Sequence, residues 1–195
     1  MLARLKQETR CHHAAADTER LSPLASPTSV AGYITYLARI YGFEAPLEAG
    51  LARTPGLGLL VDAPMRERSH LLTKDLRTLG FSPARISGLA RCTTIAPFPG
   101  SPEALGWMYV IERNVVLNAI VRRHLVRRMP EEIELAGAYL SSFDGLGSQR
   151  WRELGIALDE VGKSTTQVER VIDAAHTAFR SQHAWLRSGF YADVA

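Results

Sequence analysis

The hydrophobic pattern of the chain is centred on one long segment, residues 101–128, whose middle is apolar on nearly every side of a helix. Ser101 is a suitable N-cap, and Pro102 suits the first helical position. Pro130 ends the helix, and no proline or glycine interrupts it after Gly106. Because a helix that is apolar all round is buried all round, we predict one nearly straight central helix over residues 101–128.

Hydrophobic residues at helical spacing predict further helices on both sides of this segment, and prolines or glycines mark their ends. The predicted helices are residues 2–20, 30–42 with a helical continuation over 44–52, 64–79, a short helix after Pro83, 131–142, 149–161 and 165–188. Residues 21–29, 54–63, 92–100 and the turn at 143–148 are predicted to connect them. Since no segment alternates with the period of a strand, we predict an all-α, single-domain helical bundle over residues 1–195.

Four polar residues, Glu112, Arg113, Asn114 and Asn118, interrupt the apolar middle of the central helix. They make the apolar run too short for a membrane span. Asn114 and Asn118 are four residues apart and therefore lie on one helical face. Because a buried amide needs hydrogen-bond partners, two interpretations are open. The amides bond to each other, to neighbouring backbone or to a buried water, or they line an internal cavity.

The composition is that of a globular protein with a real core: 195 residues, 46% apolar and 22% charged. The net charge is only +3, and basic residues cluster only at the end of the central helix, which is too narrow for a nucleic-acid footprint. Cys11 and Cys92 have neither the spacing of a metal site nor a disulfide framework. MLARLKQETR carries charges where a signal peptide is hydrophobic. We therefore expect a cytoplasmic protein without nucleic-acid or membrane partners.

The first predicted helix contains adjacent metal-binding side chains, in Cys11, His12 and His13. Adjacent helical residues point about 100° apart, so at most one of the two histidines faces the core. His13 has Thr9 one turn before it and Asp17 one turn after it. A carboxylate four residues away can orient the imidazole of a metal-bound histidine, so this spacing is a weak indication of a metal ligand.

Three segments resemble heme oxygenases, in the order in which that family has them. LKQETRCHHAAAD is similar to the opening helix of the family, where a lysine, a threonine, the proximal heme histidine and an acidic residue have the spacing of Lys6, Thr9, His13 and Asp17. RSHLLTKDLRTLGFSP resembles the middle helix of bacterial heme oxygenases associated with bacteriophytochromes. EALGWMYVIE resembles the start of the distal helix. Together they imply the family fold over essentially the whole chain.

The resemblance implies that heme is the cofactor and substrate, with His13 as the axial ligand of its iron. Lys6 would meet a heme propionate, and Asp17 would belong to the same heme-binding set. The family reaction opens heme with dioxygen to biliverdin, carbon monoxide and iron. Electrons come from an external donor, and the bilin would serve a photoreceptor such as a bacteriophytochrome. The iron carries the chemistry, while the protein positions oxygen near one meso carbon.

The distal segment departs from the family pattern. After YVLE the family has G-S-x-x-G-G, whose glycines let the backbone approach heme, whereas this chain reads Arg113-Asn-Val-Val-Leu117-Asn118. We expect the side chains of Leu117 and Asn118 to project into the space where heme sits. Arg113, at the first of these six positions, would also belong to the heme-binding residues. If the pocket is open, the amides of Asn114 and Asn118 lie opposite His13 and can donate a hydrogen bond to iron-bound oxygen, as candidate catalytic groups.

Three functions remain open at the level of sequence. The chain is a working heme oxygenase, a protein that binds heme or a bilin without turning it over, or a helical interaction protein that has lost the pocket. His13 with Lys6 and Asp17 favours the first two functions. The missing glycines favour the last two. The family reaction is the best single prediction.

Overall fold

The computed structural model is an all-α bundle, and it describes residues 1–25, 28–142 and 147–188. No strand occurs in these residues, which confirms the predicted fold class. The elements are α1 (Leu2–Glu8), α2 (Arg10–Arg20), α3 (Ser22–Ala25), α4 (Val30–Ala52), the 3₁₀ turns η1 (Leu57–Leu59) and η2 (Pro64–Arg66), α5 (Ser69–Thr78), α6 (Pro83–Ser87), α7 (Ser101–Val126), α8 (Pro130–Leu135), α9 (Gly147–Val161) and α10 (Thr165–Leu186).

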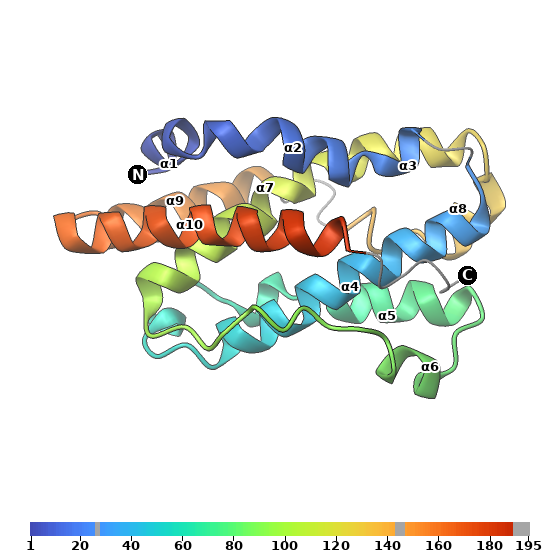
Figure 1. Cartoon of the computed structure of the whole chain (residues 1–195), viewed down its shortest axis with the longest axis horizontal. Coiled ribbons are helices and arrows are strands. Elements are labelled where there is room, and N and C mark those ends of the chain that lie inside the picture. The colour runs from blue at the N-terminus through green and yellow to red at the C-terminus, as the bar shows by residue number, and fades with distance from the viewer. Residues whose placement is uncertain (26–27, 143–146, 189–195) are drawn as a thin grey trace.

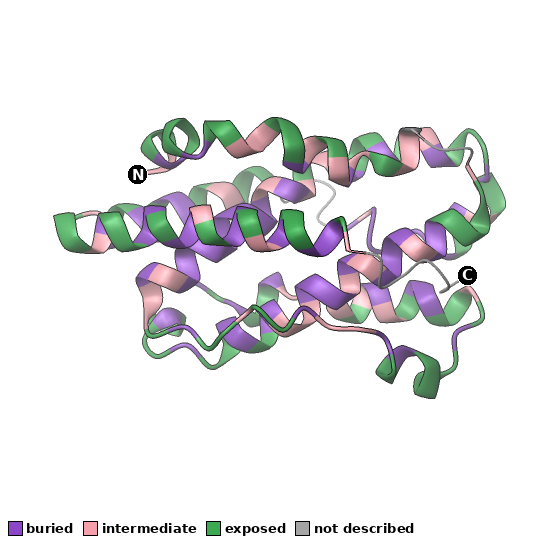
Figure 2. Ribbon diagram, in the orientation of Figure 1, coloured by how far each residue is buried: buried purple, intermediate pink, exposed green. Residues whose placement is uncertain are grey.

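The helices are arranged around the pair α7 and α10, which share the most extensive interface of the fold. In Figure 1, α1 to α3 follow one another along one long edge of the molecule, while α4 and α5 form the opposite side. Figure 2 shows that α7, α10 and α4 carry most of the buried surface, whereas α1 and α2 expose their outer faces. The predicted proximal residues lie on α1 and α2 and the predicted distal residues on α7, and α2 and α7 are in contact with each other.

The central helix is confirmed as one continuous helix, α7, which ends two residues earlier than predicted. Its N-cap is Gly100 rather than Ser101, whose hydroxyl donates instead to the carbonyl of Pro55 at 3.3 Å. Gly106 lets α10 approach closely, because a Cβ there would lie 2.4 Å from the carbonyl oxygen of Val171. None of the helices in the described ranges is long and apolar enough to cross a membrane.

The predicted first helix over residues 2–20 is wrong in one respect, because the structure divides it at Thr9 into α1 and α2. The Thr9 hydroxyl donates to the carbonyl of Leu5 at 2.7 Å, a back-bond that bends helices. The loop predicted over residues 21–29 is also wrong in part, since Ser22–Ala25 form the short helix α3. Both errors are local breaks or extensions of helix that hydrophobic periodicity does not reveal.

The second and last helices follow their predictions closely. α4 runs without a break through the expected continuation and contains Pro46 in its interior. The side chain of Ser29 caps it by accepting from the backbone N–H of Gly32 at 3.0 Å. The helix predicted over residues 165–188 is confirmed as α10. Element boundaries set by local caps are therefore well predicted.

Two other helices are shorter than predicted because buried carboxylates capture backbone N–H groups. The helix predicted over 64–79 is divided into η2 and α5, where Glu48 accepts from the N–H groups of Arg68 and Ser69. The helix predicted over 131–142 ends at Leu135, since Asp75 accepts from the N–H groups of residues 138 and 139. The turn predicted at 143–148 lies mostly outside the described residues.

Candidate functional site

The break at Thr9 positions the predicted proximal histidine. Thr9 is fully buried, and its Oγ1 lies 3.2 Å from Nε2 of His13 on the next helical turn. On the other side, the half-buried His13 ring packs against Phe179 of α10, with ring centroids 5.7 Å apart. The imidazole is therefore held between its own helix and α10.

His13 is held in the neutral form at neutral pH. Burial lowers the pKa of its imidazole, and the nearby Arg113 guanidinium lowers it further, against the opposing effect of Asp17. A neutral imidazole keeps a lone pair for a metal ion. Lys6, an exposed cation on α1, also acts on His13. The structure thus brings Lys6, His13 and Asp17 into one neighbourhood, as the spacing predicted.

An ion pair joins the proximal and distal helices. Arg113 of α7 contacts both carboxylate oxygens of Asp17 on α2, at 2.6 Å and 3.0 Å. The Arg113 side chain is 18% exposed and that of Asp17 is 37% exposed. A bidentate guanidinium–carboxylate pair has good geometry, but this degree of exposure keeps its strength modest. The ion pair therefore links α2 to α7.

The two distal asparagines bind protein groups. The side-chain N–H of Asn114 donates to Gln182 of α10 at 2.9 Å. Asn118 donates to the carbonyl of Tyr139 at 3.3 Å and accepts from Arg20 of α2 at 3.2 Å. Both amides thus donate to distant parts of the chain rather than to each other, and Oδ1 of Asn114 is buried without a hydrogen-bond partner among the described residues. Asn118 also lines a cleft of about 510 Å³ between α7 and α9, which opens to the surface and is therefore not the internal cavity of the second interpretation. Leu117 is half-buried on the same helix.

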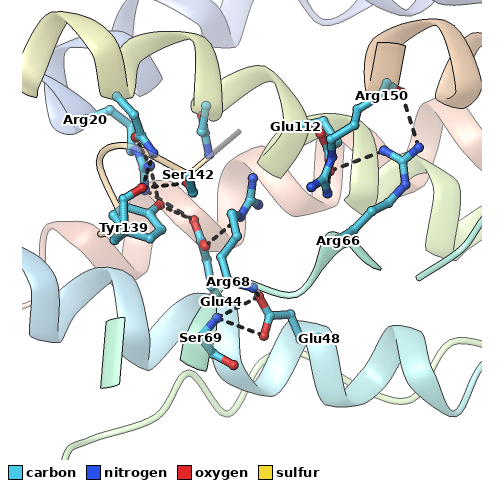
Figure 3. A network of polar contacts seen from close by, with 12 residues as sticks. Arg20, Glu44, Glu48, Arg66, Arg68, Ser69, Glu112, Tyr139, Ser142 and Arg150 are labelled. Atoms are coloured by element: carbon cyan, nitrogen blue, oxygen red, sulfur yellow. Dashed lines mark hydrogen bonds and ion pairs between the residues drawn. The ribbon is translucent and has the colours of Figure 1, made fainter. Parts of the chain in front are cut away.

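Asn118 contacts a buried polar network that was not predicted from the sequence. Figure 3 shows its members Arg20, Glu44, Arg68 and Tyr139. Arg20 donates to the Tyr139 hydroxyl at 2.7 Å, and that hydroxyl donates to Glu44 of α4 at 2.8 Å. Arg68 lies 3.3 Å from the other Glu44 oxygen. Arg20, Glu44 and Arg68 are each at most 2% exposed. These positions could have been recognised in the sequence, because each is a charged residue within the apolar stripe of a predicted helix.

A second buried group of charges lies further along α7, as Figure 3 also shows. Glu112 is 5% exposed and accepts from Arg150 of α9 at 3.0 Å, with Arg66 3.4 Å away. The Arg66 side chain also reaches Glu153, at 3.0 Å. Since both arginines converge on one carboxylate, Glu112 is a structural link between α7, η2 and α9.

Comparison with protein families assigns this arrangement. The model of the heme oxygenase family matches residues 1–188, nearly the whole chain. The chain belongs to the heme oxygenase family. No curated protein and no solved structure gives a match. Family membership confirms the resemblance to heme oxygenases over nearly the whole chain, while the bacteriophytochrome-associated subtype stays a prediction.

The predicted proximal residues, on α1 and α2, and the predicted distal residues, on α7, fit heme differently. On the α2 side, His13 is a neutral imidazole with the cation Lys6 nearby, which is a donor set suited to heme iron and a propionate. On the α7 side, two of the positions that heme oxygenases give to glycine carry Arg113 and Asn118, and both side chains bind α2. The proximal residues therefore fit heme, and the distal residues do not fit the close backbone approach of the family.

Proposed function

We propose that this protein is a heme-binding member of the heme oxygenase family with little or no heme-opening activity. The observation that carries the proposal is the ion pair between Arg113 of α7 and Asp17 of α2. It places a side chain, and a contact, where the family has glycine. The proposal keeps heme as the ligand and assigns the family reaction a low rate.

Binding is supported by the residues on α1 and α2. His13 would hold the iron, and the cation Lys6 would meet a propionate. Heme, when bound, supplies the iron and its redox chemistry. The chain supplies a neutral imidazole on a helix that packs against Phe179, so the ligand is positioned before heme arrives. A protein that does not bind heme has no need of this set.

Entry of heme between α2 and α7 requires the Arg113–Asp17 pair to open. Partly exposed ion pairs contribute only about 0–1 kcal/mol, so this opening is a small cost to binding. The buried contacts of Asn118 are a larger obstacle, because its amide is 1% exposed and serves both Arg20 and Tyr139.

Low activity is supported by the same distal residues. Opening one meso position requires that oxygen be directed by a surface close to the heme plane. Glycine permits that approach, whereas Arg113, Leu117 and Asn118 hold the α7 backbone away. The predicted catalytic amides also donate within the protein, Asn114 to the side-chain oxygen of Gln182 and Asn118 to the carbonyl of Tyr139. Their donors are therefore committed to the protein core.

Hemin titration of the purified protein tests binding. We expect a Soret band of a histidine-ligated heme at one hemin per chain. His13→Ala should abolish this band, and the adjacent His12→Ala is the matched control that should leave it nearly intact. Equal loss from both variants would place the ligand elsewhere. Absence of any Soret shift in the unaltered protein would favour the interaction protein that has lost its pocket.

Single-turnover assays test the second half of the proposal. The hemin complex is supplied with a reductant and oxygen, and biliverdin is followed by its absorption. We expect slow or absent biliverdin formation with heme still bound. Brisk biliverdin production would show a working heme oxygenase, and an electron donor and a bilin acceptor such as a bacteriophytochrome would then be the partners to seek.

A further inference from the structure

A group of metal-binding side chains lies beside His13, where α2 packs against α10. Cys11 and His12 come from α2, and His176 comes from α10. One ligand atom from each residue lies within 4.8 Å of the other two. The closest approach joins Nε2 of His12 to Nδ1 of His176, at 2.9 Å. The two imidazoles thus present nitrogen atoms to each other across the helix interface.

Packing between α2 and α10 holds these rings in place. His12 stacks on Phe179 with ring centroids 5.3 Å apart and an interplanar angle of 15°. His176 meets the edge of His12, with centroids 5.1 Å apart. Both histidines are half-buried, while Cys11 is exposed. Two ligands are therefore pre-positioned by the core, and the third is on an accessible side chain that is free to rotate.

We propose that Cys11 Sγ, His12 Nε2 and His176 Nδ1 form a binding site for a zinc ion, with a fourth position open to water. Thiolate and imidazole are the ligands that zinc prefers, and three protein ligands with one water make a tetrahedral site. Zinc–nitrogen distances of about 2.0–2.1 Å and zinc–sulfur distances of about 2.3 Å place the ligand atoms roughly 3.3–3.6 Å apart. The observed spacing reaches this geometry through small side-chain rotations.

The surroundings indicate a site of moderate affinity. Arg180, one turn after His176, and His183 act as neighbouring positive charges on His12. A nearby cation opposes a divalent ion, whereas the thiolate of Cys11 offsets one of its charges. With one anionic ligand and an open fourth position, the site should bind zinc more weakly than a closed four-ligand structural site. Bound zinc would link α2 to α10 beside His13.

Zinc titration of tag-free, reduced protein without heme tests the site directly. We expect one zinc ion per chain and a higher midpoint of thermal unfolding in zinc, because the ion binds only the folded arrangement. Cobalt(II) serves as a spectroscopic probe and should give a thiolate-to-cobalt charge-transfer band. The absence of heme keeps this result separate from the proposed function, which does not depend on zinc.

Variants decide which residues bind the ion. Cys11→Ser should remove the charge-transfer band, and His176→Ala should weaken zinc binding by at least roughly tenfold. His176→Gln is a second variant of similar size, and circular dichroism confirms that each protein is folded. His70→Ala removes an exposed histidine on α5 and should leave binding unchanged. Equal binding by the unaltered protein and by both His176 variants, or no binding by the unaltered protein, would overturn the proposal.

Discussion

Arg113 and Asp17 form a bidentate ion pair that links α7 to α2, with contacts of 2.6 Å and 3.0 Å. They are 96 residues apart in the chain. The resemblance to heme oxygenases implies a glycine at the position of Arg113, and it implies that Asp17 belongs to the set around His13, the expected proximal histidine. One substitution therefore both fills the distal face and attaches it to the proximal helix.

Restoring glycine at this position should increase hemin affinity. Arg113→Gly removes the side chain and the contact to Asp17, so heme no longer has to displace them. The variant should lose about 1–2 kcal/mol of stability, from about 1 for a glycine inside a helix and up to about 1 for a partly exposed ion pair. Hemin titration and urea unfolding measure the two effects.

The matched control is Arg122→Gly, an exposed arginine on the same helix. It carries the same helical cost without a position facing α2, so its hemin affinity should equal that of the unaltered protein. Unchanged or lower affinity in Arg113→Gly would show that Arg113 assists heme rather than obstructing it.

Asn118→Ala should destabilise the fold by about 2–3 kcal/mol. The substitution removes an acceptor for the buried Arg20 and a donor to the Tyr139 carbonyl, and hydrogen bonds to a buried charged group are among the stronger ones. Val116→Ala on the same helix is the control, because Val116 is 70% exposed and its loss should change stability by less than about 0.5 kcal/mol. Urea unfolding compares them. Similar small losses would mean that the network contributes little.

This result also affects any attempt to restore activity by glycine. The double change Leu117→Gly and Asn118→Gly should permit closer backbone approach and raise biliverdin yield. Its cost is about 3–5 kcal/mol, since the lost contact of Asn118 with Arg20 adds to two interior helical glycines. Assays should therefore be run at low temperature, with folding confirmed by circular dichroism.

Gly106→Ala should destabilise the protein although alanine favours helix. A Cβ at this position would lie 2.4 Å from the Val171 carbonyl oxygen and 2.8 Å from the Cβ of Ala174, so α7 and α10 must separate. Overpacking of this kind costs about 1–3 kcal/mol. Gly58→Ala is the control, because no atom lies within 4 Å of a Cβ there. A thermal midpoint equal to that of the control would contradict the close approach.

Glu48 should make stability fall as pH rises. Burial is the main cause that raises the pKa of its carboxyl to about 7 in the folded state, against an ordinary value of 4.5. Between these values the folded state holds a proton that the unfolded state has lost, so increasing pH favours unfolding. Relative to Glu48→Gln, the unaltered protein should lose about 1–3 kcal/mol between pH 5 and pH 8. Urea unfolding at both pH values measures the difference, and parallel pH profiles would refute the assignment.

The sequence by itself predicted the class of fold and several helix ends. Hydrophobic periodicity located α4, α7 and α10, because the buried face of a helix repeats with the helical turn. Ser29 caps α4, as a serine before a helical segment often does, and Gly80 adopts the left-handed conformation, with φ of +94°, that helix ends favour. The order of the three segments that resemble heme oxygenases, the first of which contains His13, indicated the family that the comparison confirmed. These features depend on neighbouring residues, so they can be read along the chain.

The tertiary structure decided which distant side chains meet. The early end of α8 depends on hydrogen bonds from the N–H groups of residues 138 and 139 to Asp75, which compete with helix formation. The approach of His12 to His176 joins residues 164 apart. Helical periodicity shows which face of a helix is buried but not what it packs against. Whether α2 and α7 are linked by an ion pair, and which residue of α10 completes the proposed zinc site, is therefore determined only when α2, α7 and α10 pack together.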